Sequence, residues 1–193
     1  MKNFTSVLIG SVLCLCTSAI SAQQHAGLKA GINYSGLSGY DGGKTVNPHA
    51  GFFTQWSLSG KWQLRPELLW SAGKQQYTVD ENESIATQTL NMQFASVPVV
   101  FRYMFNSRCF AEAGPQLSVL VSAKDISTSG AKADVKRSLR STDFSLVAGA
   151  GFSPAKRLEV YLRYNYGFTD LTLYDGNRDC NRGLQAGVAF SLK

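Results

Sequence analysis

The sequence predicts an all-β protein: an eight-stranded antiparallel up-and-down transmembrane β-barrel. From Gly27 to the C-terminus, bulky apolar side chains alternate with small or polar ones. A strand directs successive side chains to opposite faces, so one face of each segment is apolar and the other is polar. Short turns and long polar loops join these segments in alternation, which is typical of barrels that cross a membrane.

The first 22 residues have the layout of a cleaved secretory signal peptide. Lys2 provides a positive start, residues 4–15 are apolar and uncharged, and small residues lead to Ala22. The apolar stretch is shorter than the roughly 20 residues that a membrane-spanning helix needs. We expect residues 1–22 to be removed and residues 23–193 to form a single outer-membrane β-barrel domain.

Eight segments carry the alternation, most clearly 158–168, where Val160 and Leu162 alternate with Glu159 and Arg163. The expected strands are about 26–35, 49–58, 62–73, 91–105, 109–121, 142–152, 158–168 and 183–192. An even number of strands places both termini and the short turns on one side. Four long outer loops are then expected at roughly 36–48, 74–90, 122–141 and 169–182.

Two prolines lie inside expected strands. Pro66 and Pro98 cannot donate a hydrogen bond to a neighbouring strand. A closed barrel has no edge strand to accommodate them, so we expect a bulge or a local break near each.

Charged residues of the polar phase are expected to point into the barrel. They are Lys29, Arg65, Glu67, Arg102, Glu112, Glu159 and Arg163. Buried charges need partners, and eight strands enclose only enough space for side chains to fill. We therefore predict a structural ionic network in the lumen and no open channel. A conducting pore or a ligand pocket remains the alternative.

Positive charge gathers in the third expected loop, in a chain of formal net charge +6. Its basic residues could contact lipopolysaccharide phosphates beside the barrel rim. The candidates are Lys132, Lys136, Arg137 and Arg140. A loop surrounded only by water is the alternative interpretation, and an exported protein is not expected to bind nucleic acid.

Catalysis, cofactors and metals find little support in the sequence. Residues 23–193 contain two histidines, His25 and His49, and no cluster of histidine and cysteine. His49 could act with a loop serine, but no spacing supports a catalytic group. Asp170, Asp175 and Asp179 lack the dense spacing of a dedicated calcium loop. We expect a protein that is not an enzyme and has no cofactor or metal.

Two cysteines remain after the signal peptide. Cys109 follows a short turn, and Cys180 lies in the last long loop. The apolar band of such a barrel is about 25 Å tall. Bridged cysteines have Cα atoms within about 7 Å of each other. Both are therefore predicted to be free thiols at opposite ends of the barrel.

Five segments also resemble a known family. They are GLKAGINYS from Gly27, LRPELLWSAG from Leu64, VPVVFRYMF from Val97, AGPQ from Ala113 and RYNYGFTD from Arg163. In this order the chain resembles the PorT-like outer-membrane β-barrel proteins over nearly all of residues 23–193. The resemblance implies an outer-membrane barrel in a Gram-negative cell. Ser96 stands where this family often has glutamate, so a lumen role of that acid does not carry over.

Three function hypotheses follow. The first is a non-enzymatic integral protein of the cell outer membrane, whose four outer loops act as a surface scaffold or recognition platform. The second is a small-solute channel, and the third is a soluble lipocalin-like ligand-binding barrel. The expected partners are outer-membrane lipid, lipopolysaccharide and the barrel-assembly machinery. Residues 187–192 resemble the C-terminal signal that this machinery recognises.

Overall fold

The computed structural model describes residues 24–38, 45–81, 84–126, 132–134, 141–170 and 180–192. The expected signal peptide lies outside these residues. The described chain is almost entirely β-structure. Its strands are β1 (Gln24–Ser38), β2 (Thr45–Ser59), β3 (Trp62–Glu81), β4 (Ser84–Met104), β5 (Cys109–Ile126), β6 (Lys132–Asp134), β7 (Thr142–Ala155), β8 (Leu158–Asp170) and β9 (Cys180–Ser191).

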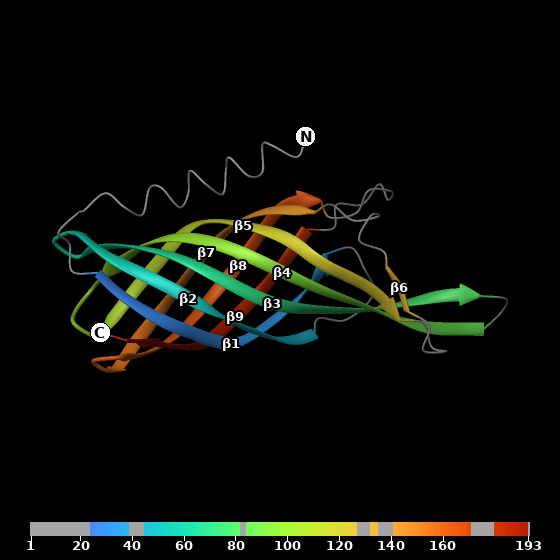
Figure 1. The fold of residues 1–193 in the computed structure, drawn as a ribbon, viewed down its shortest axis with the longest axis horizontal. Coiled ribbons are helices and arrows are strands. Elements are labelled where there is room, and N and C mark those ends of the chain that lie inside the picture. Colours follow the sequence, from blue (N-terminus) through green and yellow to red (C-terminus); the bar gives the residue numbers. More distant parts are fainter. Residues whose placement is uncertain are drawn as a thin grey trace.

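Eight of these strands form a closed barrel (Figure 1). All pairings are antiparallel, in the order β4-β3-β2-β1-β9-β8-β7-β5, and β4 pairs with β5 to complete the ring. The first and last strands lie side by side, with Leu28 opposite Phe190. The short β6 pairs with the end of β5 and lies outside the ring. The predicted eight-stranded barrel is confirmed.

The three short turns lie where the sequence predicts them. Between β2 and β3, Gly60 has a φ of 57°, in the left-handed region that glycine adopts without strain. Between β4 and β5, the Asn106 side-chain oxygen accepts hydrogen bonds from the backbone N–H groups of Arg108 and Cys109, at 2.8 and 2.7 Å. This local bond shapes the reversal without a glycine.

The prediction of a long loop over 74–90 is wrong. β3 and β4 remain paired as far as Glu81 opposite Ser84, so this segment is a hairpin that projects past the other strands (Figure 1). The sequence of this hairpin is mostly polar at both alternating positions, and such a composition resembles that of a loop. The third expected loop also contains regular structure, the three residues of β6.

The two strand prolines interrupt hydrogen bonding without shifting the register. β2 and β3 keep one register on either side of Pro66, but the pairs between Phe53–Glu67 and Trp56–Leu64 are missing. β3 and β4 likewise lose the two pairs next to Pro98. The expected local breaks are present. The register shifts of the barrel occur elsewhere, including one at Gln93 and Phe94.

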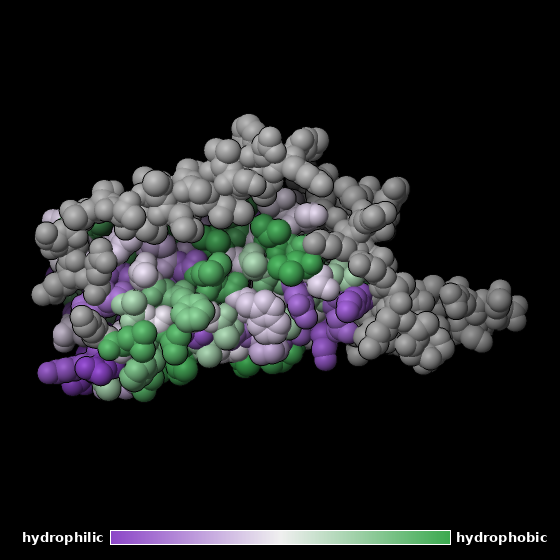
Figure 2. All heavy atoms as spheres, in the orientation of Figure 1, coloured by the Kyte–Doolittle hydropathy of each residue, from purple (hydrophilic) through white to green (hydrophobic). Residues whose placement is uncertain are grey.

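The apolar phase faces outward. One row of paired residues crosses five adjacent strands, and its side chains are 36–63% exposed: Leu158, Phe190, Leu28, Phe52 and Leu68. Figure 2 shows hydrophobic residues along the middle of one face and hydrophilic residues toward its ends. A water-soluble protein would bury such a belt, whereas lipid tails cover it in a membrane barrel.

Candidate functional site: the charged lumen

The polar phase of five strands meets inside the barrel. Lys29 comes from β1, Arg65 and Glu67 from β3, Arg102 from β4, Glu112 from β5, and Glu159 and Arg163 from β8. Six of these residues are at most 4% exposed, and Glu159 is half-buried. The structure brings all seven sequence-predicted lumen residues together.

These residues form one continuous series of alternating charge. It runs Lys29–Glu67–Arg163–Glu112–Arg102–Glu159–Arg65, joined by ion pairs of 3.0, 2.7, 2.5, 3.0, 2.9 and 2.8 Å. Each carboxylate lies between two cations. We call this series the lumen ion chain.

The contact between Arg163 and Glu67 anchors the centre of the lumen ion chain. The two Nη atoms of Arg163 donate to the two carboxylate oxygens of Glu67 at 2.8 and 2.7 Å. A planar guanidinium matches a carboxylate in this two-bond arrangement. Arg163 Nε donates to Glu112, so one side chain links β8 to β3 and β5.

Aromatic rings lie against all four cations of the lumen ion chain, with Arg163 Cζ 5.3 Å from the ring centroid of Tyr161. Arg102 Cζ lies 3.6 Å from the ring centroid of Phe110, and Arg65 Cζ lies 4.0 Å from that of Phe53. Lys29 Nζ lies 3.9 Å from the ring centroid of Tyr161. A cation over a ring face is favourable in a desolvated site. These cations are therefore stabilised by carboxylates and by aromatic faces.

Glycines on neighbouring strands leave room for the three rings. A Cβ added to Gly151 would lie 2.1 Å from the Phe110 ring, and one added to Gly27 would lie 2.4 Å from the Phe53 ring. Tyr161 extends across Gly187 and Gly31, and its hydroxyl lies 2.6 Å from His49 Nε2 on β2.

Sequence reasoning missed two polar members of this site. Gln55 Oε1 accepts hydrogen bonds from Arg65 Nε at 3.0 Å and from Arg102 Nη1 at 3.4 Å. His49 is buried and bonds Tyr161. Both lie on the inward phase of β2, and the alternation of that strand in the sequence could have placed them in the lumen. Only the charged members of the phase were predicted to face the lumen.

The predicted lipopolysaccharide contacts lie outside the described side chains. The structure describes the backbone of Lys132 in β6 but not its side chain. Lys136, Arg137 and Arg140 lie outside the described residues. Among the described residues, no group of three histidine, cysteine or acidic side chains is arranged to hold a metal. No helix in this part of the chain is long and apolar enough to span a membrane.

A closed antiparallel ring with an apolar outer belt and a charged interior is the arrangement expected of an outer-membrane barrel. A family model described as "Outer membrane protein beta-barrel domain" matches residues 21–173. The chain belongs to this family. It is an integral outer-membrane β-barrel protein. No curated protein sequence matches this outer-membrane barrel.

The likeness to Neisserial surface protein A supports the fold. The outer-membrane barrel is similar to Neisserial surface protein A, with a TM-score of 0.52 and 12% identity, covering 86% of this chain and 96% of that one. Ail, the attachment invasion locus protein of Yersinia pestis, matches with a TM-score of 0.48 and 13% identity, covering 89% and 99% of the two chains. A de novo designed transmembrane β-barrel matches with a TM-score of 0.40, 15% identity and coverages of 89% and 97%.

Proposed function

We propose that this protein is a non-enzymatic outer-membrane barrel whose lumen is closed by side chains and whose outer end serves as a surface scaffold or recognition platform. The lumen ion chain is the observation that supports the closed lumen. Its seven side chains come from strands around the ring and pair with one another across the interior. Moving a solute through would require buried ion pairs to separate.

The cellular setting is part of the proposal. The chain would leave the cytoplasm of a Gram-negative cell through its signal peptide and be folded by the barrel-assembly machinery. Lipopolysaccharide and outer-membrane lipid would surround it. Within the barrel family, the ordered motifs from Gly27 to Asp170 favour the PorT-like proteins.

The projecting β3–β4 hairpin supports a recognition role. Beyond Lys74 none of the described strands pairs with β3 on its β2 side, so backbone donors and acceptors are available there. Extended peptides can bind such an edge by adding a strand. The hairpin is on the loop side, which faces outward in this class of barrel.

Planar-bilayer recording tests the closed lumen. The unmodified protein is expected to give no stable single-channel steps. Glu67→Ala with Arg163→Ala removes two neighbouring members together, and this variant is expected to conduct or to flicker. Regular ohmic steps from the unmodified protein would contradict the proposal and make the small-solute channel the better function.

Gel migration tests the membrane barrel against the lipocalin-like alternative. A soluble ligand carrier would hold the apolar phase inside, whereas here the charged phase is inside and Leu162 is 54% exposed. A folded barrel extracted from the outer membrane is expected to shift on an SDS gel after boiling. An unshifted protein in the periplasmic fraction would support the soluble alternative.

A further inference from the structure

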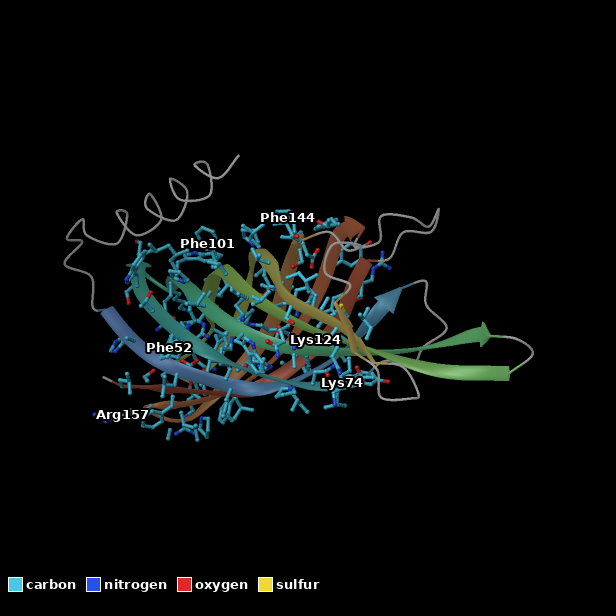
Figure 3. The ribbon with its side chains drawn as sticks, turned by 45° about the vertical axis from the view of Figure 1, so that its right-hand side comes forward. Phe52, Lys74, Phe101, Lys124, Phe144 and Arg157 are labelled. Atoms are coloured by element: carbon cyan, nitrogen blue, oxygen red, sulfur yellow. The ribbon has the colours of Figure 1, made fainter. Side chains whose placement is uncertain are left out.

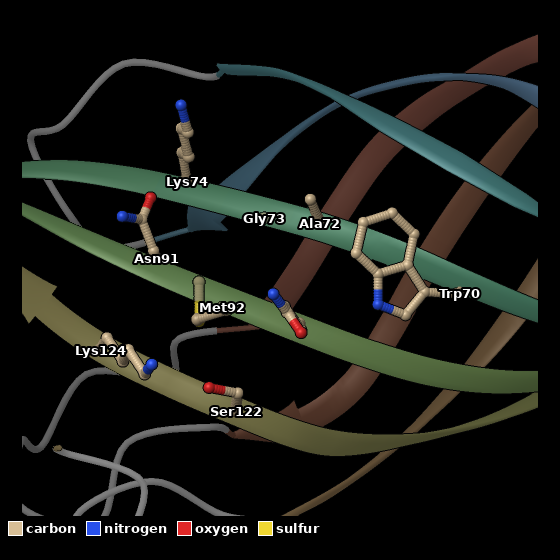
Figure 4. Close-up of a pocket in the computed structure, with 9 residues that line it drawn as sticks. Trp70, Ala72, Gly73, Lys74, Asn91, Met92, Ser122 and Lys124 are labelled. Carbon is tan, nitrogen blue, oxygen red and sulfur yellow. The ribbon is translucent and has the colours of Figure 1, made fainter.

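A second polar feature lies on the outside of the barrel, where β3, β4 and β5 leave the apolar belt. A pocket of about 310 Å³ is bordered there by two lysines, and Trp70 lies at its end nearest the belt (Figure 4). The remaining lining residues are Ala72, Gly73, Asn91, Met92, Gln93 and Ser122. We call it the rim pocket. It is separate from the lumen ion chain.

Strand pairing aligns the polar residues of the rim pocket in two rows. Lys74 is opposite Asn91, and Asn91 is opposite Lys124. Ala72, Gln93 and Ser122 form the adjacent row. Directly paired residues share a face of the sheet. Neighbouring strands are about 4.8 Å apart, so the two lysine backbones lie roughly 10 Å apart, within reach of one small anion over Asn91.

A bulge in β5 creates this arrangement. Phe94 is opposite Leu120 and Gln93 is opposite Ser122, so Val121 is an extra residue in β5. Before it, Leu120 is buried and Val119 is exposed; after it, Ala123 is buried and Lys124 is exposed. An extra residue reverses which side chains point outward. If β5 alternated regularly through Val121 instead of bulging there, Lys124 would face the lumen.

The position of the rim pocket matches the headgroup layer of a membrane. Trp70 is 43% exposed and stands on the outward face two residues before Ala72. Tryptophan rings favour the boundary between acyl chains and headgroups. Figure 3 shows Lys74 and Lys124 toward one end of the barrel and Arg157 at the opposite end. The rim pocket is therefore at the loop end, just above the apolar belt.

The polar groups of the rim pocket suit a phosphate. Lys74 and Lys124 are exposed, and no described side chain forms an ion pair with either. Asp134 on β6 is opposite Lys124, so two lysines outweigh one aspartate in this register. Asn91 lies between the two lysines in this register, and its side-chain amide nitrogen can donate a hydrogen bond to an anion.

We propose that the rim pocket binds a phosphate on the headgroup of an outer-leaflet lipid, with lysine ammonium groups at both sides and Trp70 against the lipid's acyl base. The outer leaflet as the source rests on the proposed outward orientation of the loop end. Lipid is favoured over a soluble phosphate because the apolar belt continues directly below the pocket, at Trp70 and Leu68.

The test uses full-length protein folded in neutral detergent micelles, with bound lipid counted by native mass spectrometry. The probes are diphosphoryl lipid A, lipid A without its phosphates, and inorganic phosphate. The charge-matched variants are Lys74→Gln/Lys124→Gln at the pocket and Lys61→Gln/Lys156→Gln at the turn end. Each lysine near an anionic group is worth about fivefold in affinity, so the pocket variant should lose on the order of 20-fold.

The turn-end variant is expected to bind diphosphoryl lipid A like the unmodified protein, and phosphate-free lipid A is expected to bind far more weakly. Equal losses in both double variants would overturn the proposal, as would phosphate-free lipid A binding undiminished. Inorganic phosphate that binds as tightly as lipid A would identify a soluble-anion site instead. The single variants, each with an expected loss of about fivefold, decide the matter if the double variant does not fold. Channel steps in bilayers would refute the closed lumen without altering these lipid counts.

Discussion

Tyr161 lies across Gly187 so closely that a Cβ on the glycine would come within 2.6 Å of the tyrosine hydroxyl oxygen. The ring is held in this position by Lys29 against its face and by the 2.6 Å contact with His49. Side chains of β8, β1 and β2 thus interlock because β9 has a glycine, with no side chain, at residue 187. The fit explains why a glycine is needed in the middle of β9.

Gly187→Ala is expected to destabilise the barrel by about 1–3 kcal/mol, because the added methyl group overpacks a filled interior. The midpoint of urea unfolding in lipid vesicles measures this cost. Gly73→Ala is the matched control, because its new Cβ would find its nearest atom at 3.6 Å, an ordinary contact. Equal midpoints for the two variants would show that Tyr161 and the Ala30 backbone oxygen, 2.4 Å from the new Cβ, both give way without cost.

Leu162→Arg tests the outward phase near the middle of β8. Leu162 is 54% exposed, between Val160 and Tyr164 on the same face. Arginine facing lipid at the midplane costs about 2–4 kcal/mol, and the cost falls to about 0–1 kcal/mol near the boundary. Leu192→Arg, at the end of the last strand, should therefore be much milder. An unchanged vesicle-folding midpoint for Leu162→Arg would contradict the lipid-facing assignment.

Glu112→Gln tests a fully enclosed carboxylate pairing of the lumen ion chain. Glu112 pairs with Arg102 and Arg163, and all three side chains are at most 2% exposed. Arg102 and Arg163 each keep one other carboxylate, so the loss is expected to lie toward the lower end of the roughly 3–5 kcal/mol that removing one partner of a buried ion pair costs. Glu159→Gln also removes a carboxylate shared by two arginines, but this side chain is 13% exposed. Water can solvate the arginines that lose Glu159, so Glu159→Gln is expected to lower the unfolding free energy less than Glu112→Gln. A larger loss for Glu159→Gln would argue against a lumen that excludes water.

The two cysteines of residues 23–193 report which end of the barrel faces outward. Cys109 begins β5 at the turn end and is a free thiol. Cys180 begins β9 at the loop end, opposite Ser38. On intact cells, a membrane-impermeant maleimide is expected to label the unmodified protein and not the Cys180→Ser variant. Cys109→Ser serves as the control that keeps its label. A Cys109–Cys180 bridge found by non-reducing peptide mapping would contradict the observed strand arrangement.

The strands that cross the membrane were predictable because two different environments impose a strict alternation. Val160 and Glu159 could be assigned to opposite faces from their neighbours alone, and the barrel confirms the strand count. The hairpin beyond Lys74 was not predictable in the same way. Most residues of this segment are polar at both alternating positions, so the sequence shows no strict apolar phase there and segment 74–90 resembles a loop.

The composition of the lumen was accessible from the sequence, but its contacts were not. The polar phase named Arg65 and Glu159 as inward residues, yet their pairing depends on how strands β3 and β8 face each other across a closed ring. The direction of the Lys124 side chain could not be predicted from the sequence either. Its direction depends on the extra residue Val121, and a bulge leaves no clear mark in the alternation until the partner strand is known.

The pairing of β1 with β9 has a consequence for biogenesis. Leu28 and Phe190 meet only after the whole chain has been synthesised, and the seven members of the lumen ion chain are enclosed only when that seam closes. An open sheet inserted early would expose those seven charges to hydrocarbon, at a cost of several kcal/mol or more for each unpaired charge. Insertion and closure of this barrel must therefore proceed together, with the ion pairs forming as lipid is excluded.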